Sequence, residues 1–194
     1  MSINKYSTAR SVLNKISKMA LILPCRNKTP QIGADSWLAP NATIVGDVIL
    51  GDECSVWFNA VIRGDVNSIR MGNKVNIQDG AVIHCTFEKT KTILGNNVSV
   101  GHNALVHGCT VEDNVLIGMG SIVMDNCYIE SGSIIAAGAV LLEGTRVEAG
   151  SIYAGVPAKK VKNISKELFE GEVMRIANNY KMYASWFKSE EEKS

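Results

Sequence analysis

The chain has 194 residues, of which 46% are hydrophobic and 20% charged, so it is long enough to form one domain with its own core. The net charge of +1 argues against binding to nucleic acid or to an anionic membrane, and no run approaches the ~18 apolar residues that would cross a bilayer. Five cysteines without a CxxC pair indicate reduced thiols and a cytoplasmic protein.

Residues 1–18 form a segment with four basic side chains and no acidic one. We predict that this segment is a flexible extension that precedes the domain. Its Ser- and Lys-bearing composition leaves a transit peptide as the alternative.

A six-residue repeat dominates the chain that follows. An aliphatic or aromatic residue recurs every six positions over 32–62 and again over 111–153, and a mostly small residue follows each one after four positions. This period fits neither an amphipathic helix nor a simple alternating strand. It fits a solenoid whose coils have three flat sides, each side being one hexad, with the repeating residues pointing inward. We therefore predict an all-β solenoid, a parallel β-helix of about seven coils over residues 19–162.

The repeat is interrupted between its two regular stretches. We place the inward positions there at Ile69, Val75 and Ala81, which puts Asp79 in an inward small-residue slot. A carboxylate in that slot is costly unless it accepts several hydrogen bonds. Asp79 could stabilise a turn or take part in chemistry, and the sequence leaves both open.

The C-terminal segment has a different pattern, typical of one amphipathic helix. We expect this helix over residues 163–188, with Ser165 as its cap and Glu167 in its first turn, and a frayed tail over 189–194. One face of the helix would carry Leu168, Val173, Ile176, Tyr180, Tyr183 and Phe187.

The only three histidines of the chain, His84, His102 and His107, lie close together in a short stretch of the sequence. In the repeat frame they occupy the fourth, third and second positions of their hexads, all of which point outward. They could be solvated surface residues, but their clustering predicts metal ligands. His84 and His107 fall near one corner of the solenoid, whereas His102 cannot easily face them within one chain.

A three-histidine site would close if His102 came from a neighbouring subunit. Such a contact joins two different surfaces, and closure at three copies gives a homotrimeric ring. Three imidazoles with an open fourth position are typical of catalytic Zn²⁺, and Fe²⁺ or Co²⁺ would also suit them.

Together these motifs resemble the γ-class carbonic anhydrases, in their short-loop bacterial branch. The resemblance rests on Arg63-x-Asp65, Asn76-x-Gln78-Asp79-Gly80, His84 and His102-x4-His107-Gly108 within a hexapeptide solenoid. It implies a left-handed β-helix and a trimer with a metal ion at each subunit interface.

The resemblance also implies roles for individual residues. It implies an intersubunit ion pair of Arg63 with Asp65, and a hydrogen bond from Gln78 to metal-bound water or substrate. Asn76 matches a polar residue near the site, and Tyr180 matches a tyrosine that reaches it in relatives. The implied activity is the reversible hydration of carbon dioxide to bicarbonate.

The chain departs from the best-studied branch of this family at the proton-transfer step. Val66 stands where that branch has a glutamate, and Cys85–Ile93 is too short to be the acidic loop that carries a shuttle glutamate. Alternative functions are hydrolysis of coenzyme A thioesters at the same metal site, a non-catalytic metal-stabilised trimer, and acyl transfer from an acyl-coenzyme A with a single basic histidine.

Overall fold

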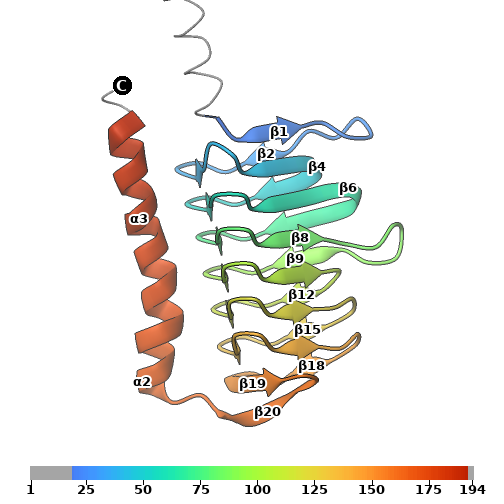
Figure 1. Ribbon diagram of the computed structural model, residues 1–194, viewed down its shortest axis with the longest axis vertical. Coiled ribbons are helices and arrows are strands. Elements are labelled where there is room, and N and C mark those ends of the chain that lie inside the picture. Colours follow the sequence, from blue (N-terminus) through green and yellow to red (C-terminus); the bar gives the residue numbers. More distant parts are fainter. Residues whose placement is uncertain (1–18, 192–194) are drawn as a thin grey trace, which may run out of the picture.

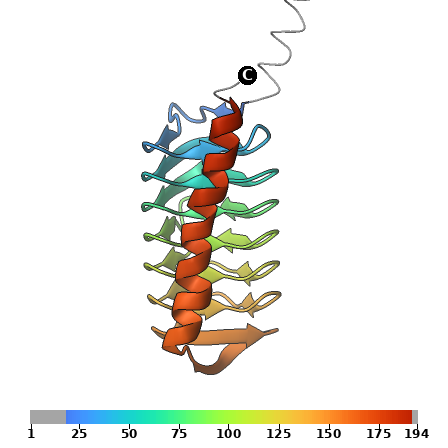
Figure 2. The same cartoon turned by 90° about the vertical axis from the view of Figure 1, so that its left-hand side faces the viewer.

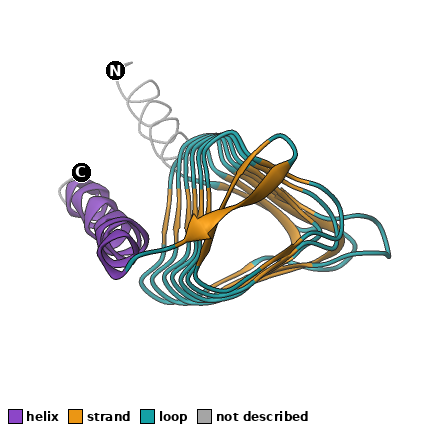
Figure 3. Cartoon of the chain, turned by 90° about the horizontal axis from the view of Figure 1, so that it is seen from below, coloured by secondary structure: helices purple, strands orange, loops and turns teal. Residues whose placement is uncertain are grey.

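The computed structural model describes residues 19–191, and these residues wind into a left-handed parallel β-helix with one C-terminal helix beside it (Figure 1). Seen along its axis the β-helix is a triangular prism (Figure 3). The prediction of an all-β solenoid of about seven coils is confirmed. The predicted N-terminal extension, residues 1–18, lies outside the described residues.

Each coil contributes one strand to each of three prism faces, which we name by their strands. The first face contains β1 (Leu21–Leu23), the first halves of β4 (Thr43–Leu50) and β6 (Val61–Met71), then β8 (Val82–His84), β11 (Leu105–His107), β14 (Ile122–Val123) and β17 (Val140–Leu141). The second face contains β2 (Gln31–Ile32), the second halves of β4 and β6, then β9 (Thr92–Leu94), β12 (Thr110–Val111), β15 (Tyr128–Ile129) and β18 (Arg146–Val147). The third face contains β3 (Trp37–Leu38), β5 (Ser55–Val56), β7 (Asn76–Ile77), β10 (Ser99–Val100), β13 (Leu116–Ile117), β16 (Ile134–Ile135), β19 (Ser151–Gly155) and β20 (Ala158–Asn163).

The core of the prism is a set of three ladders of stacked side chains, one for each face. On the third face, Val56, Ile77, Val100, Ile117 and Ile135 lie in register on successive coils and are fully buried. Burying one such side chain stabilises the fold by roughly 1.5–3 kcal/mol. The six-residue period of the sequence arises because every hexad supplies one rung to a ladder.

The repeat frame that we predicted between residues 69 and 85 is wrong by two positions. Ile44 pairs with Ile62, whereas Val48 pairs with Ile69, so the register shifts within the strand pair and β6 holds extra residues at the corner between the first two faces. The ladder residues of this region are therefore Met71, Ile77 and Ile83. This shift turns Asp79 outward into a corner turn, and it moves His84 from the fourth to the second position of its hexad.

The end of the β-helix differs from the predicted parallel pattern. Strand β20 turns back and pairs antiparallel with β19, which covers the edge of the last coil. The helical segment follows as α2 (Lys166–Leu168), the π-helical turn η1 (Phe169–Met174) and α3 (Arg175–Glu191). It therefore begins later than predicted, because β20 occupies residues up to Asn163, and it continues past the predicted end at 188. Ser165 caps it, since its side chain accepts a hydrogen bond from the Leu168 N–H.

The C-terminal helix runs back along the outside of the prism, from the last coil towards the first (Figure 2). Near its end Phe187 packs against Trp37 and Trp57 of the third face, with ring centroids 4.8 and 5.8 Å away. Tyr180 packs edge-on against Trp57 at 5.1 Å. These contacts fix the helix beside the third face. No helix within residues 19–191 has the length and apolar character needed to cross a membrane.

Candidate metal-binding site

His84 and His107 lie side by side at the ends of neighbouring strands on the first face. Strands β8 and β11 pair in parallel, with His84 opposite His107 in the register. Both residues hold the hexad position just after a buried ladder residue, so both side chains point outward at the same corner. The Nδ1 atom of His84 is 3.1 Å from the Nε2 atom of His107.

A carboxylate contacts the far nitrogen of each of these rings. Asp65 Oδ1 is 3.0 Å from His84 Nε2, and Asp125 Oδ1 is 3.0 Å from His107 Nδ1. Partial burial alone would raise the pKa of each carboxyl group, but hydrogen bonds hold both below the ordinary value. The donors are Arg63 and His84 for Asp65, and Thr90, His107 and Thr86 for Asp125. Burial lowers the pKa of His84, which favours the neutral imidazole.

This arrangement fits a metal ion. An ionised carboxylate accepts the N–H of each ring, which leaves a lone pair on His84 Nδ1 and another on His107 Nε2. Two lone pairs that face each other at 3.1 Å repel unless a cation or a proton lies with them. Metal-binding histidines almost always donate their second N–H to a carboxylate, a carbonyl or water. The donor chemistry of the pair is therefore that of two ligands of one ion.

His102 lies at a different corner, in the turn between β10 and β11. Its Nδ1 atom is 2.8 Å from Asp79 Oδ2, so it too has a carboxylate on one ring nitrogen. Its Nε2 atom is 3.3 Å from the hydroxyl of Tyr180, which reaches across from α3. Burial, followed by the nearby Asp79 and Tyr183, raises the pKa of Tyr180 to about 12, so the phenol stays protonated at neutral pH.

The structure thus brings two of the three predicted ligands together and leaves the third apart. Within residues 19–191 of a single chain, no three His, Cys, Asp or Glu side chains form a group that could hold a metal ion. One corner of the prism carries the His84–His107 pair, and another carries His102.

Gln78 and Asn76 lie inside the same region as His102. Both are buried, and the Gln78 side-chain nitrogen donates to Asn76 Oδ1 at 3.0 Å. Asn76 in turn donates to Ser99 Oγ at 2.7 Å. This chain of bonds fixes the Gln78 amide beside His102.

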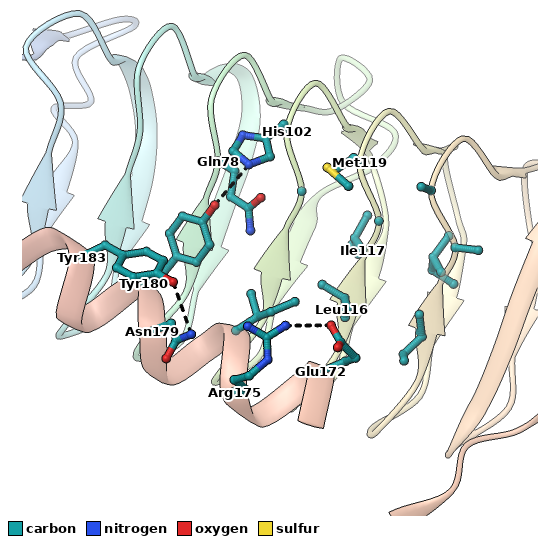
Figure 4. Close-up of a pocket in the computed structure, with 17 residues that line it drawn as sticks. Gln78, His102, Leu116, Ile117, Met119, Glu172, Arg175, Asn179, Tyr180 and Tyr183 are labelled. Atoms are coloured by element: carbon teal, nitrogen blue, oxygen red, sulfur yellow. Dashed lines mark hydrogen bonds and ion pairs between the residues drawn. The ribbon is translucent and has the colours of Figure 1, made fainter. Parts of the chain in front are cut away.

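A cavity of about 410 Å³ opens next to Gln78 and His102, between the third face and the C-terminal helix (Figure 4). Its wall is mostly apolar and includes Leu116, Ile117 and Ile134. Tyr180 and Asn179 line it from the helix side. A pocket of this size and character is typical of small-molecule sites.

Arg63 and Asp65 form an ion pair within one chain, with Arg63 Nη1 2.5 Å from Asp65 Oδ2. The predicted ion pair across a subunit interface would require Arg63 of one subunit to contact Asp65 of the next, either in place of its own Asp65 or in addition to it. In the chain as described, Asp65 bridges Arg63 and His84, which the sequence analysis did not anticipate.

Sequence reasoning also missed Asp125. The signal was present, because Asp125 follows His107 at a distance of one coil, or three hexads, along the chain. A systematic search for acidic residues one coil from each histidine would have found it.

Comparisons with known proteins agree with this fold. The family described as Bacterial transferase hexapeptide (six repeats) matches residues 29–64 and 108–143. A carbonic anhydrase of Geobacillus kaustophilus is 45% identical over 169 residues, which cover 87% of this chain and 92% of that protein. Gamma carbonic anhydrase 2, mitochondrial, of Arabidopsis thaliana is 36% identical, and the match covers 87% of this chain and 61% of the plant protein.

Among solved structures, a Bacillus cereus protein described as an acetyltransferase candidate has a TM-score of 0.85 and 36% identity. The match covers 89% of this chain and 99% of that one. The shared fold and the high identity over nearly all of the Geobacillus protein decide the family. The chain belongs to the γ-class carbonic anhydrase-like family of hexapeptide-repeat proteins.

Proposed function

We propose that this protein is a metal-dependent carbonic anhydrase that reversibly hydrates carbon dioxide to bicarbonate at the interfaces of a homotrimer. In this proposal His84 and His107 of one subunit and His102 of the next hold one ion, which we take to be Zn²⁺, with Fe²⁺ or Co²⁺ as alternatives. The unpaired cysteines support a cytoplasmic location.

The observation that carries the proposal is that an aspartate carboxylate contacts the ring of each of the three histidines. His84, His102 and His107 each have one ring nitrogen within 3.0 Å of an aspartate oxygen, and each has the other nitrogen turned away from it. Three surface histidines without a shared role would have no reason to share this environment. Metal ligands do share it, because the carboxylate fixes the tautomer and the ring orientation.

Exposed apolar side chains support the trimer. On the first face, which carries His84 and His107, the structure leaves Leu21, Ile122, Met124 and Leu142 exposed. A row of such side chains on one face is typical of a protein–protein contact. A neighbouring subunit that covered this face would also place a second corner against the histidine pair.

The chemistry that an ion supplies in such a site is Lewis-acid activation of water near neutral pH. The residues of the chain then have separate tasks. The Asn76–Gln78 pair orients an amide towards the substrate, and the Tyr180 hydroxyl offers a hydrogen bond beside His102. The apolar cavity wall suits carbon dioxide, which is itself apolar.

The test is stopped-flow hydration of carbon dioxide by protein loaded with Zn²⁺ or, without oxygen, with Fe²⁺. We expect activity with at least one of these metals, and its loss in the His102→Ala variant. Absence of activity from a trimer shown to be metal-loaded would contradict the proposal.

The ion pair at the corner gives a second prediction. We expect Arg63→Ala to raise the dissociation constant of the trimer about 30-fold or more, because removing one member of an interface charge pair costs ~2 kcal/mol or more. Dilution series in analytical ultracentrifugation would measure this. The control is Arg146→Ala, which breaks the comparable Arg146–Glu130 pair on the second face. Equal dissociation constants for the two variants would show that Arg63 lies outside the interface.

The cavity favours hydrolysis of coenzyme A thioesters as a second candidate function. A volume of about 410 Å³ exceeds the needs of carbon dioxide and suits a short acyl chain next to the same metal site. Hydrolysis of short-chain acyl-coenzyme A by the metal-loaded protein, without carbon dioxide hydration, would favour this candidate. Inactivity on both substrates would favour a metal-stabilised structural trimer.

A further inference from the structure

Asp125 has different partners from the polar residues that hold the same hexad position at the next corner of the prism, between the second and third faces. The third position of several hexads is an Asp or Asn whose Oδ1 atom accepts a backbone N–H from the coil before. Examples are Asp52 with the N–H of Ala34, Asn73 with that of Asp52, Asn96 with that of Asn73, and Asp113 with that of Asn96, all at 2.7–2.9 Å. This bond supports a corner turn, and it is the ordinary role of the position.

The two carboxylate oxygens of Asp125 instead accept hydrogen bonds from side chains. Its Oδ1 atom accepts from Thr90 Oγ1 at 2.7 Å and contacts His107 Nδ1 at 3.0 Å. Its Oδ2 atom accepts from Thr86 Oγ1 at 3.1 Å. The carboxylate is thus held from two sides while it holds the histidine.

Both threonines come from the short loop between β8 and β9, which projects at the corner next to His84 (Figure 1). The loop is braced internally, because the N–H of Thr86 donates to Thr90 Oγ1 at 3.0 Å. A third threonine, Thr92, is fully buried and donates to the carbonyl oxygen of His84 at 2.6 Å. Thr92 is the first residue of β9, and its hydroxyl also accepts the N–H of Gly108 at 3.0 Å, so it bonds the backbone next to both histidines.

We infer that Asp125 is a positioning residue for His107, and that Thr86 and Thr90 of the loop clamp its carboxylate so that His107 Nε2 keeps its lone pair towards His84. This inference rests on the proposed metal site. It assigns the short loop a structural task at that site, where the sequence showed only the lack of an acidic shuttle. At the corner of Asp125, the N–H of Gly108 donates to Thr92 Oγ1, and the Thr86–Thr90 clamp takes the place of the backbone N–H that fixes Asp113 at the next corner.

The experiment compares Asp125→Ala, the double variant Thr86→Val with Thr90→Val, and Asp113→Ala in the full-length chain. Asp113 is the matched control because it has the same hexad position and the ordinary backbone bond. One readout is zinc affinity, by competition with a chromophoric chelator. The other is the tautomer of His107 in the zinc-free protein, from the ¹⁵N shifts of its ring nitrogens. Thermal unfolding of each variant reports whether it is folded.

We expect Asp125→Ala to weaken zinc binding by roughly 10- to 100-fold, the range seen when such outer partners are removed. The double valine variant should show a smaller loss, and Asp113→Ala should change the affinity by less than about twofold. In Asp125→Ala the Nδ1–H tautomer of His107 should give way to a mixture. The inference is overturned if Asp125→Ala matches Asp113→Ala in both readouts. The tautomer is read without metal or substrate, so failure of the proposed activity would leave this result intact.

Discussion

His102→Ala should remove the metal from every site of the assembly. Each proposed site takes one histidine at the turn corner of one subunit and two from the first face of another, so a single substitution leaves each ion with two ligands. We expect zinc affinity to fall by more than about 100-fold, because even the loss of an outer carboxylate partner costs up to that much. Metal analysis of the purified variant after dialysis would measure the loss.

The matched control for His102→Ala is Met119→Ala, at the same turn position one coil further along the prism. Its metal content should equal that of the unsubstituted protein. If His102→Ala retained one tightly bound metal ion per chain, the site would lie within a single subunit. The model of shared ligands would then be wrong.

The second large effect should come from Gly108→Ala. Gly108 follows His107 and has φ +56°, a left-handed conformation that costs an alanine ~1–2 kcal/mol. A Cβ atom there would also overlap Asp125 Oδ1 and Thr90 Oγ1. We expect the free energy of unfolding to fall by ~3 kcal/mol or more, and zinc binding to weaken because the Asp125 carboxylate must move.

Gly138→Ala separates the two causes of that effect. Gly138 has φ +68°, but a Cβ atom there would meet nothing within 4 Å, so only the conformational cost of ~1–2 kcal/mol applies. Urea denaturation of both variants gives the comparison. Equal losses of stability in the two variants would mean that Asp125 can move away from the new Cβ atom at little cost. The close approach of Asp125 would then not be a reason for a glycine at position 108.

Much of the fold could be predicted because each hexad places one buried residue in a ladder, which gives the sequence its period of six. Every rung needs an inward aliphatic residue, such as Ile117 or Ile135, so the pattern is written at each coil. The frame failed only where β6 holds extra residues, since Ile69 and Val75 are also buried and gave the wrong register a plausible apolar pattern. Asp79 was misplaced for the same reason.

The candidate site was predictable to a smaller extent. The three histidines could be selected from the sequence because their number is small and their spacing is close. Their carboxylate partners lie about one coil away in the chain and meet them only through coil stacking, as Asp125 meets His107 and Asp79 meets His102. The frame error of two positions hid the pairing of Asp79 with His102, because it placed the Asp79 side chain inward.

The extra residues of this solenoid all lie at one corner. The additional residues of β6 and the loop between β8 and β9 both join the first face to the second, next to His84 (Figure 1). The ladders pass this corner without interruption, since Ile83 stacks on Ile62 and Leu94 on Met71. Segments of different length or composition can therefore be exchanged here during evolution while the scaffold stays unchanged. Insertions at this corner would change the side chains that surround His84 and His107 without changing the buried ladders, so related proteins could differ in activity while they keep the same fold.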